Sequence, residues 1–201
     1  MKKIFYLDIQ NIDNELEGIT AISLVERAAV DVDFLKFNAD TPQPNKFEFD
    51  EEKHIIKGVA IRADYPIYRF SEEIGDYYVV FTKDVIQKLI QKFFKDDLIK
   101  KVNLQHDSSQ YVDNIYITES YTIDRKNGLN PIEFQSIEDG SWIISMKVEN
   151  DEVWKSIKQN DKLNGFSIEG YFYELSSHKK ETKNEVTISF DNWIDSLIKN
   201  K

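Results

Sequence analysis

The segment Leu163–Phe172, "LNGFSIEGYF", surrounds a single serine with large apolar side chains. Phe166 and Ile168 alternate with Ser167 and Glu169, which is the two-residue period of a β-strand. The apolar face is expected to enter the core, so Ser167 is expected to point away from it, toward a cleft. Glu169 on that same face reads as an ordinary solvated carboxylate. The stretch therefore predicts a strand that presents an accessible serine.

Two glycines, Gly165 and Gly170, interrupt this strand. Glycine weakens a strand interior unless the strand bulges or another backbone comes close to it. We favour access of an extended substrate to Ser167 as the reason for these glycines. A bend in a small β-barrel is the alternative.

Composition excludes several classes of protein. A net charge of −10 argues against a broad nucleic-acid surface, which needs clustered basic side chains. The absence of cysteine excludes disulfides, thiolate metal sites and a cysteine nucleophile. The histidines His54, His106 and His178 show no metal-ligand spacing, so no metal and no cofactor is expected. No apolar run is long enough to span a bilayer, and the start of the chain does not read as a signal peptide, so a cytosolic protein is expected.

The remaining pattern predicts many short strands and few helices. One helix is expected after Thr82 as its cap, and a second, "DEVWKSIKQ", after Asn150 or Asp151. Strands are expected at 4–9, 19–25, 32–37, 54–61, 76–81, 101–106, 111–123 and 140–148. We interpret 1–201 as a single domain, with N-terminal strands and a proline-containing loop in 1–46 and an amphipathic C-terminal helix in 184–201. The predicted fold class is α+β, mainly β: a closed or nearly closed β-barrel surrounded by a few helices.

A nucleophilic serine needs a base within hydrogen-bonding reach. His106 is the best candidate, because it ends the apolar strand "VNLQH" and precedes the polar "DSSQ". His54 opens a strand beside acidic residues, and His178 lies in a lysine-rich stretch.

Three motifs follow one another along the chain: "NLQHD", "YITES" and "GSWIISMKVENDEVWKSIKQNDKLNGFSIEG". Together, over Lys101–Gly170, they resemble the prohead (capsid maturation) serine proteases of tailed phages, which are related to herpesvirus assemblin. The N-terminal "GITAISLVERAAV" is similar to the "ISLV…PA" segment of these enzymes, with Ala28 in place of the expected proline. The resemblance implies a β-barrel surrounded by helices.

The resemblance also implies roles for individual residues. Ser167 matches the nucleophile and His106 the general base. Glu119, in "TES", is the first choice for the third catalytic residue, because a carboxylate there could orient the imidazole. The rivals for that third position are Glu26, Glu169 and His178.

The implied function is that of a serine endopeptidase acting during phage prohead maturation. Its expected partners are the phage scaffold protein, the major capsid protein and the protease itself, through autoproteolysis. A homo-oligomer is possible. Binding to nucleic acid or to a membrane is not expected. Its expected location is the host cytoplasm, inside the immature capsid. The alternatives are a non-catalytic virion or scaffold-associated protein that retains the fold, and a barrel-type binding module of the host cell.

Overall fold

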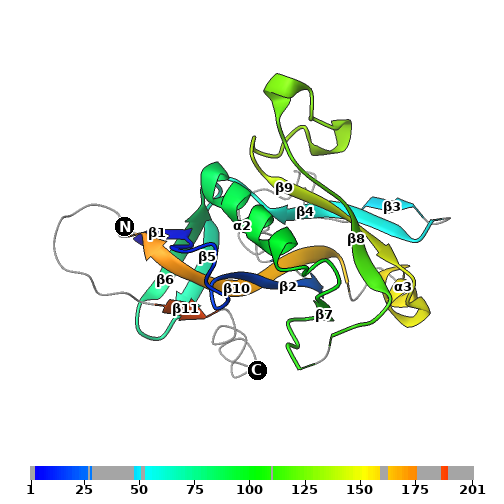
Figure 1. Cartoon of the computed structure of the whole chain (residues 1–201), viewed down its shortest axis with the longest axis horizontal. Helices are drawn as coiled ribbons and strands as arrows, with labels where there is room; N and C mark the ends of the chain where they lie inside the picture. The colour runs from blue at the N-terminus through cyan, green and yellow to red at the C-terminus, as the bar shows by residue number, and fades with distance from the viewer. Residues whose placement is uncertain are drawn as a thin grey trace.

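The computed structural model describes residues 3–26, 28, 48–50, 53–109, 111–158, 163–175 and 187–189 of the 201-residue chain. These residues form a mainly β fold of two sheets and two α-helices (Figure 1). The strands are β1 (Lys3–Asp8), β2 (Gly18–Val25), β3 (Glu48–Asp50), β4 (Ile55–Ile61), β5 (Ile67–Ser71), β6 (Gly75–Phe81), β7 (Val102–Leu104), β8 (Ile115–Thr122), β9 (Trp142–Val148), β10 (Gly165–Leu175) and β11 (Thr187–Ser189). The helices are α2 (Lys83–Lys95) and α3 (Asp151–Lys158), with 3-10 turns η1 (Arg125–Asn127) and η2 (Ile132–Phe134).

The predicted serine strand, β10, lies in the middle of the larger sheet. That sheet has the order β5-β6-β1-β10-β2-β7, and β11 also pairs with β10. β10 runs antiparallel to β2, with Ser167 opposite Ser23, and β2 runs parallel to β7, with Ser23 opposite Asn103. Residues that face each other across neighbouring strands project to the same side of a sheet. One row across three strands is therefore formed by Ser167, Ser23 and Asn103.

The smaller sheet has the order β3-β4-β9-β8, and the main core lies between the two sheets. Ile22 and Phe172 from the larger sheet and Ile56 and Ile144 from the smaller sheet are fully buried. Residues 123–141 leave the smaller sheet between β8 and β9, and project from the body of the molecule at the top of Figure 1.

The prediction of a closed or nearly closed barrel is wrong, although the mainly β class is confirmed. Among the described strands, no pairing joins β5 to β7 or β3 to β8, so both sheets have open edges. The edge of β7 is bordered instead by the segment that follows it, where the Val112 N–H donates to the Val102 carbonyl at 2.8 Å. Alternation of apolar residues shows that a strand has a buried face, but it does not show whether sheet edges meet.

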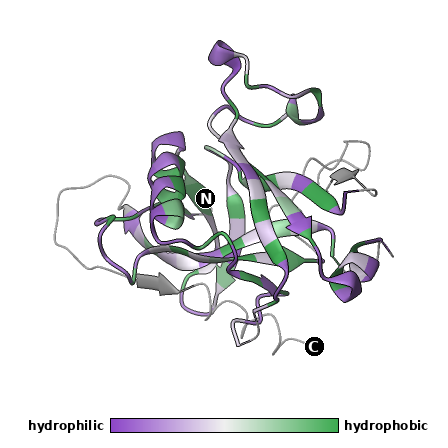
Figure 2. Cartoon of the chain, turned by 45° about the vertical axis from the view of Figure 1, so that its right-hand side comes forward, coloured by the Kyte–Doolittle hydropathy of each residue, from purple (hydrophilic) through white to green (hydrophobic). Residues whose placement is uncertain are grey.

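The helices predicted after Thr82 and after Asn150 or Asp151 are confirmed as α2 and α3. α2 begins after Thr82, whose hydroxyl accepts from the Val85 N–H at 3.4 Å, and its hydrophobic and hydrophilic sides are distinct in Figure 2. α3 is capped by Asn150 rather than Asp151. The Oδ1 atom of Asn150 accepts from the backbone N–H groups of Glu152 and Val153 at 3.1 Å each.

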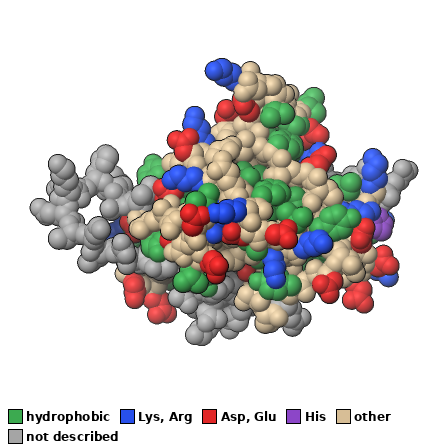
Figure 3. Space-filling model, in the orientation of Figure 1, with side chains coloured by type: hydrophobic (Ala, Val, Ile, Leu, Met, Phe, Trp, Pro, Cys, Tyr) green, Lys and Arg blue, Asp and Glu red, His purple; other side chains and the backbone are tan. Residues whose placement is uncertain are grey.

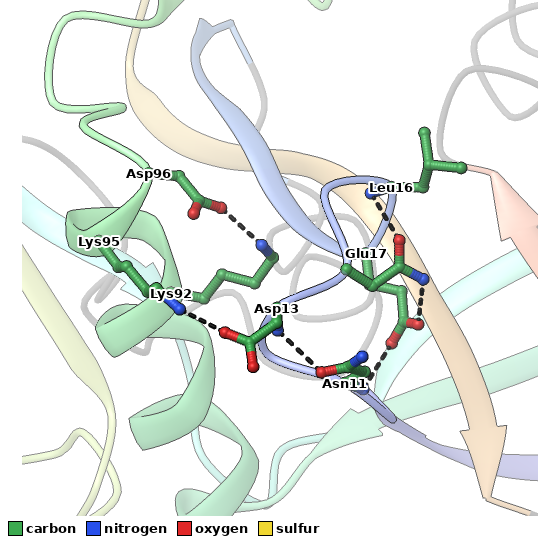
Figure 4. Close-up of polar contacts among 8 residues, drawn as sticks. Asn11, Asp13, Leu16, Glu17, Lys92, Lys95 and Asp96 are labelled. Carbon is green, nitrogen blue, oxygen red and sulfur yellow. Dashed lines mark hydrogen bonds and ion pairs between the residues drawn. The ribbon is translucent and has the colours of Figure 1, made fainter.

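The loop between β1 and β2 is held against α2 (Figure 4). Lys95 of α2 pairs with Asp13 of this loop. Inside the loop the buried Glu17 accepts from the backbone N–H groups of Gln10 and Asn11 at 2.7 and 3.1 Å. These contacts fix the point at which the chain enters β2.

Gly170 is explained by a close backbone approach rather than by access to a substrate, which corrects the expectation for this glycine. The pairing of β10 with β2 shifts register between Glu169 and Gly170. A Cβ atom at position 170 would lie 2.1 Å from the carbonyl oxygen of Gly18. Gly18 itself has a φ of +95° and lies against the methylene stem of the buried Lys92. The bend therefore belongs to a β-bulge in an open sheet.

Some predictions fall on residues outside the described ranges. These are the strand at 32–37, the proline-containing loop, His178, and 184–186 and 190–201 of the C-terminal helix. Residues 187–189 of that predicted helix are instead β11, which is antiparallel to β10. Within the described part of the chain, no helix has the length and apolar character needed to cross a bilayer. On the face drawn in Figure 3, acidic and basic side chains are interspersed.

Candidate active site

A cluster of buried polar side chains lies where β2, β7 and β10 run side by side. Its members are Ser23 (0% exposed), Asn103 (0%), Glu169 (2%), Ser167 (5%) and His106 (9%). Polar groups are costly to bury unless they are hydrogen-bonded. The contacts within this cluster therefore decide what it can do.

The turn after β7 carries His106 back over the sheet. Gln105 and His106 have φ values of 52° and 62°, in the left-handed region, which costs a non-glycine residue about 1–2 kcal/mol. The Gln105 N–H donates to the Leu24 carbonyl at 2.9 Å, and the His106 N–H donates to Ser23 Oγ at 3.2 Å. These two bonds hold a strained turn in place beside β2.

The Glu169 carboxylate is the centre of the cluster. Its Oε1 atom lies 2.6 Å from Ser23 Oγ, 2.7 Å from Asn103 Nδ2 and 3.2 Å from His106 Nδ1. Burial by itself would raise the pKa of Glu169, but the hydrogen bonds from His106, Ser23 and Asn103 outweigh it and hold the pKa below its usual value. Glu169 is therefore ionised at neutral pH.

An ionised carboxylate can only accept hydrogen bonds, so His106 donates from Nδ1 to Glu169. In the neutral imidazole this places the hydrogen on Nδ1 and makes Nε2 the basic nitrogen. The same assignment is found in a catalytic triad, where the carboxylate binds Nδ1 and the nucleophile faces Nε2.

Ser167 lies two residues before Glu169 and on the same face of β10. It is buried, whereas the sequence predicted a serine that points into an open cleft. The Nδ1 atom of the His106 ring contacts Glu169, which lies two residues further along β10. The structure thus brings Ser167, His106 and Glu169 into one cluster around Ser23.

Glu119, the first choice for the third residue, does not contact His106. It lies on β8 in the smaller sheet, where it accepts from Ser145 Oγ at 2.6 Å and pairs with Lys57 at 3.0 Å. The hydrogen bond from Ser145, followed by that from Lys57, lowers the pKa of Glu119. Its partners are neighbours across its own sheet, which the linear sequence does not show.

The carboxylate that does contact His106 is Glu169, which corrects its interpretation as a solvated group. Of the other rivals, Glu26 is exposed, and its backbone N–H donates to Gln105 Oε1 at 3.1 Å. His178 lies outside the described residues. His54 stacks on Trp154, with ring centroids 4.6 Å apart.

Sequence reasoning missed two members of the cluster, Ser23 and Asn103. Each stands in an otherwise apolar strand, Asn103 between Val102 and Leu104, and Ser23 within "AISLV". A polar residue inside a buried strand requires a partner, and this was the available signal.

A surface hollow among the described residues lies elsewhere. It is lined by residues 112–116 with Lys100 and Glu149, and it shares no residue with the buried cluster. No group of three or more metal-ligating side chains occurs in the described ranges.

A comparison with known protein families covers most of the residues of this cluster. The sequence profile of the family described as "Putative phage serine protease XkdF" matches residues 46–174, more than half of the chain. The matched region contains His106, Ser167 and Glu169, and it begins after Ser23. No curated protein and no solved structure gave a match. The chain therefore belongs to the family of phage serine proteases described under the name XkdF.

Proposed function

We propose that this chain is a serine endopeptidase that cleaves proteins of the phage prohead during capsid maturation. Ser167 is the nucleophile, His106 the general base and Glu169 the carboxylate that orients His106. The observation that carries this proposal is the buried contact of 3.2 Å between His106 Nδ1 and Glu169 Oε1, two residues from Ser167 on the same face of β10.

The proposed reaction proceeds through an acyl-enzyme. His106 Nε2 removes the hydroxyl proton of Ser167 as Oγ attacks the scissile carbonyl carbon. The carbonyl oxygen becomes an oxyanion, which backbone N–H groups commonly stabilise. The imidazolium then protonates the leaving amine as the peptide bond breaks. Water, deprotonated by His106, releases the acyl group from Ser167 in the second half of the reaction.

The role of Glu169 follows from its charge and burial. His106 becomes positively charged in the transition state, and the ionised carboxylate stabilises that charge where water is excluded. The reaction also needs Ser167 Oγ and His106 Nε2 within hydrogen-bond reach. In free enzymes such contacts are often long and tighten when substrate binds.

The proposed substrates are the scaffold protein, the major capsid protein and the protease itself, inside the immature capsid in the host cytoplasm. Membership of a phage serine protease family supports this assignment, as do the "NLQHD" and "GFSIEG" motifs of the prohead proteases. Kinship with herpesvirus assemblin is part of the same proposal and rests on the order of these motifs.

A serine-reactive fluorophosphonate probe tests the proposal. The full-length protein should be labelled on the tryptic peptide that contains Ser167, and Ser167→Ala should abolish the labelling. Co-expression with the scaffold and major capsid proteins of the same phage should yield cleaved products that the Ser167→Ala variant does not produce. Absence of both labelling and cleavage would refute the proposal.

The competing proposal is a non-catalytic virion or scaffold-associated protein that retains the protease fold. The observation in its favour is that Ser167 is buried, at 5% exposed, whereas a nucleophile must be reached by its substrate. This proposal predicts that the chain binds scaffold or capsid protein without cleaving it, equally well with serine or alanine at position 167.

A further inference from the structure

We infer that Ser23 and Asn103 are positioning residues, which hold Glu169 and His106 in the orientation that the proposed hydrolysis requires. The catalytic consequence rests on the proposed function. The positioning itself can be measured without any activity.

Ser23 contacts both elements that meet in the cluster. Its Oγ atom lies 2.6 Å from Glu169 Oε1 on β10, and it accepts the backbone N–H of His106 at 3.2 Å. The imidazole of His106 reaches the same carboxylate oxygen through Nδ1. His106 is thus held at two points, its backbone by Ser23 and its ring by Glu169. Ser23 joins these two points to each other.

Asn103 contacts both Glu169 and Ser23. Its Nδ2 atom donates to Glu169 Oε1 at 2.7 Å, while its Oδ1 atom contacts Ser23 Oγ. The reverse orientation of the amide would place its carbonyl oxygen against the carboxylate, so Glu169 fixes the amide as it stands. Ser23 has one hydroxyl hydrogen, which it can donate to either Glu169 or Asn103. In both cases the two side chains and the carboxylate form one connected network.

Strand pairing alone does not need these polar residues. In the neighbouring row of the same three strands, Ile168 lies opposite Ile22 and Ile22 lies opposite Val102, and all three residues are apolar. The row that contains Ser167 is polar across the same strands. A fully buried polar row carries a desolvation cost that apolar side chains would avoid. Its contacts converge on Glu169 and on the strained turn of His106, which is where a catalytic role needs precision.

Nuclear magnetic resonance of the histidine rings tests the positioning directly. The chain has three histidines, so the signals of His106 can be assigned by its removal in one variant. In the wild type, long-range proton–nitrogen spectra should show His106 with its hydrogen on Nδ1. Ser23→Ala and Asn103→Ala should each convert this signal to the other tautomer or to an exchanging mixture. A His106 signal that keeps its hydrogen on Nδ1 in both variants would overturn the inference.

Ser145→Ala is the matched control. Ser145 is also fully buried, and its hydroxyl also donates to a glutamate at 2.6 Å, but that glutamate is Glu119 in the other sheet. Ser145→Ala therefore removes a comparable hydrogen bond and should leave the His106 signal unchanged. The same change in Ser145→Ala as in Ser23→Ala would mean a general effect on folding and would overturn the inference.

Fluorophosphonate labelling then measures the catalytic consequence. We expect Ser23→Ala to be labelled at least about ten-fold more slowly than Ser145→Ala, as for loss of a buried hydrogen bond to a charged group. Ser23→Thr keeps the hydroxyl and should recover most of the rate. Equal rates for Ser23→Ala and Ser145→Ala would overturn the inference while the proposed function stands. A wild-type protein that neither reacts with the probe nor cleaves the co-expressed capsid proteins, but whose His106 tautomer depends on Ser23, would refute the proposed function and support the positioning.

Discussion

Replacing Glu169 with glutamine is the sharpest perturbation of the candidate site. Glutamine has nearly the same shape and can still present an oxygen to Ser23, Asn103 and His106. It removes the negative charge that faces the imidazole. We therefore expect Glu169→Gln to fold and to react much more slowly at Ser167.

The expected loss follows from the distance in the structure. A unit charge on His106 and one on Glu169, 3.2 Å apart, interact by about 5 kcal/mol at an effective dielectric constant of about 20. A neutral hydrogen bond to the glutamine oxygen restores about 1 kcal/mol of this. The remaining loss of about 4 kcal/mol corresponds to a rate about 10³-fold lower.

The assay is the second-order rate of fluorophosphonate labelling, measured for all variants at the same pH. The control is Glu119→Gln, which loses a carboxylate bound to Ser145 and Lys57 in the other sheet. Its labelling rate should stay within about three-fold of the wild type, since surface ion pairs contribute little. A Glu169→Gln rate within ten-fold of the wild type, or an equal loss in Glu119→Gln, would refute the role given to Glu169.

Three further changes test other parts of the structure. The hydrogen bonds to Glu169 lower its pKa in the folded protein, so the stability that this carboxylate contributes is present above about pH 4.3 and is lost as the pH falls through the lower pKa of the folded state. In urea unfolding, Glu169→Gln should therefore lose less stability on acidification than the wild type. Parallel curves of stability against pH would count against the lowered pKa. Gly170→Ala should destabilise the fold by about 2–3 kcal/mol in urea unfolding, since its Cβ would meet the Gly18 carbonyl, and an unchanged midpoint would contradict that close approach. Asn150→Ala should cost about 1 kcal/mol in the same measurement through loss of the α3 cap, whereas an equal cost for Asp151→Ala would argue for the other cap.

Local structure was readable from the sequence where its cause is local. Thr82 and the apolar residues spaced along 85–93 predict α2, because a cap and a 3.6-residue period depend only on near neighbours. The two-residue alternation in "GFSIEGYF" likewise predicts β10 and places Ser167 and Glu169 on one face.

The sequence did not predict that the face of β10 with Ser167 and Glu169 is buried. Alternation assigns residues to two faces, but the layers packed on each face decide which of them meets water. The turn after β7 brings His106 against Glu169, and both Ser167 and Glu169 are buried. For the same reason Glu169 was misread as a solvated carboxylate.

Residue patterns predicted the strand-rich class and the two helices, and the family resemblance singled out Ser167 and His106. The packed fold was needed to show that the sheets stay open, that Glu169 rather than Glu119 contacts His106, and that Ser23 and Asn103 connect the two. The physical reason is the register of β10 against β2 and of β2 against β7. It places side chains that are 63 to 146 residues apart in sequence within hydrogen-bond distance, and no local pattern encodes that pairing.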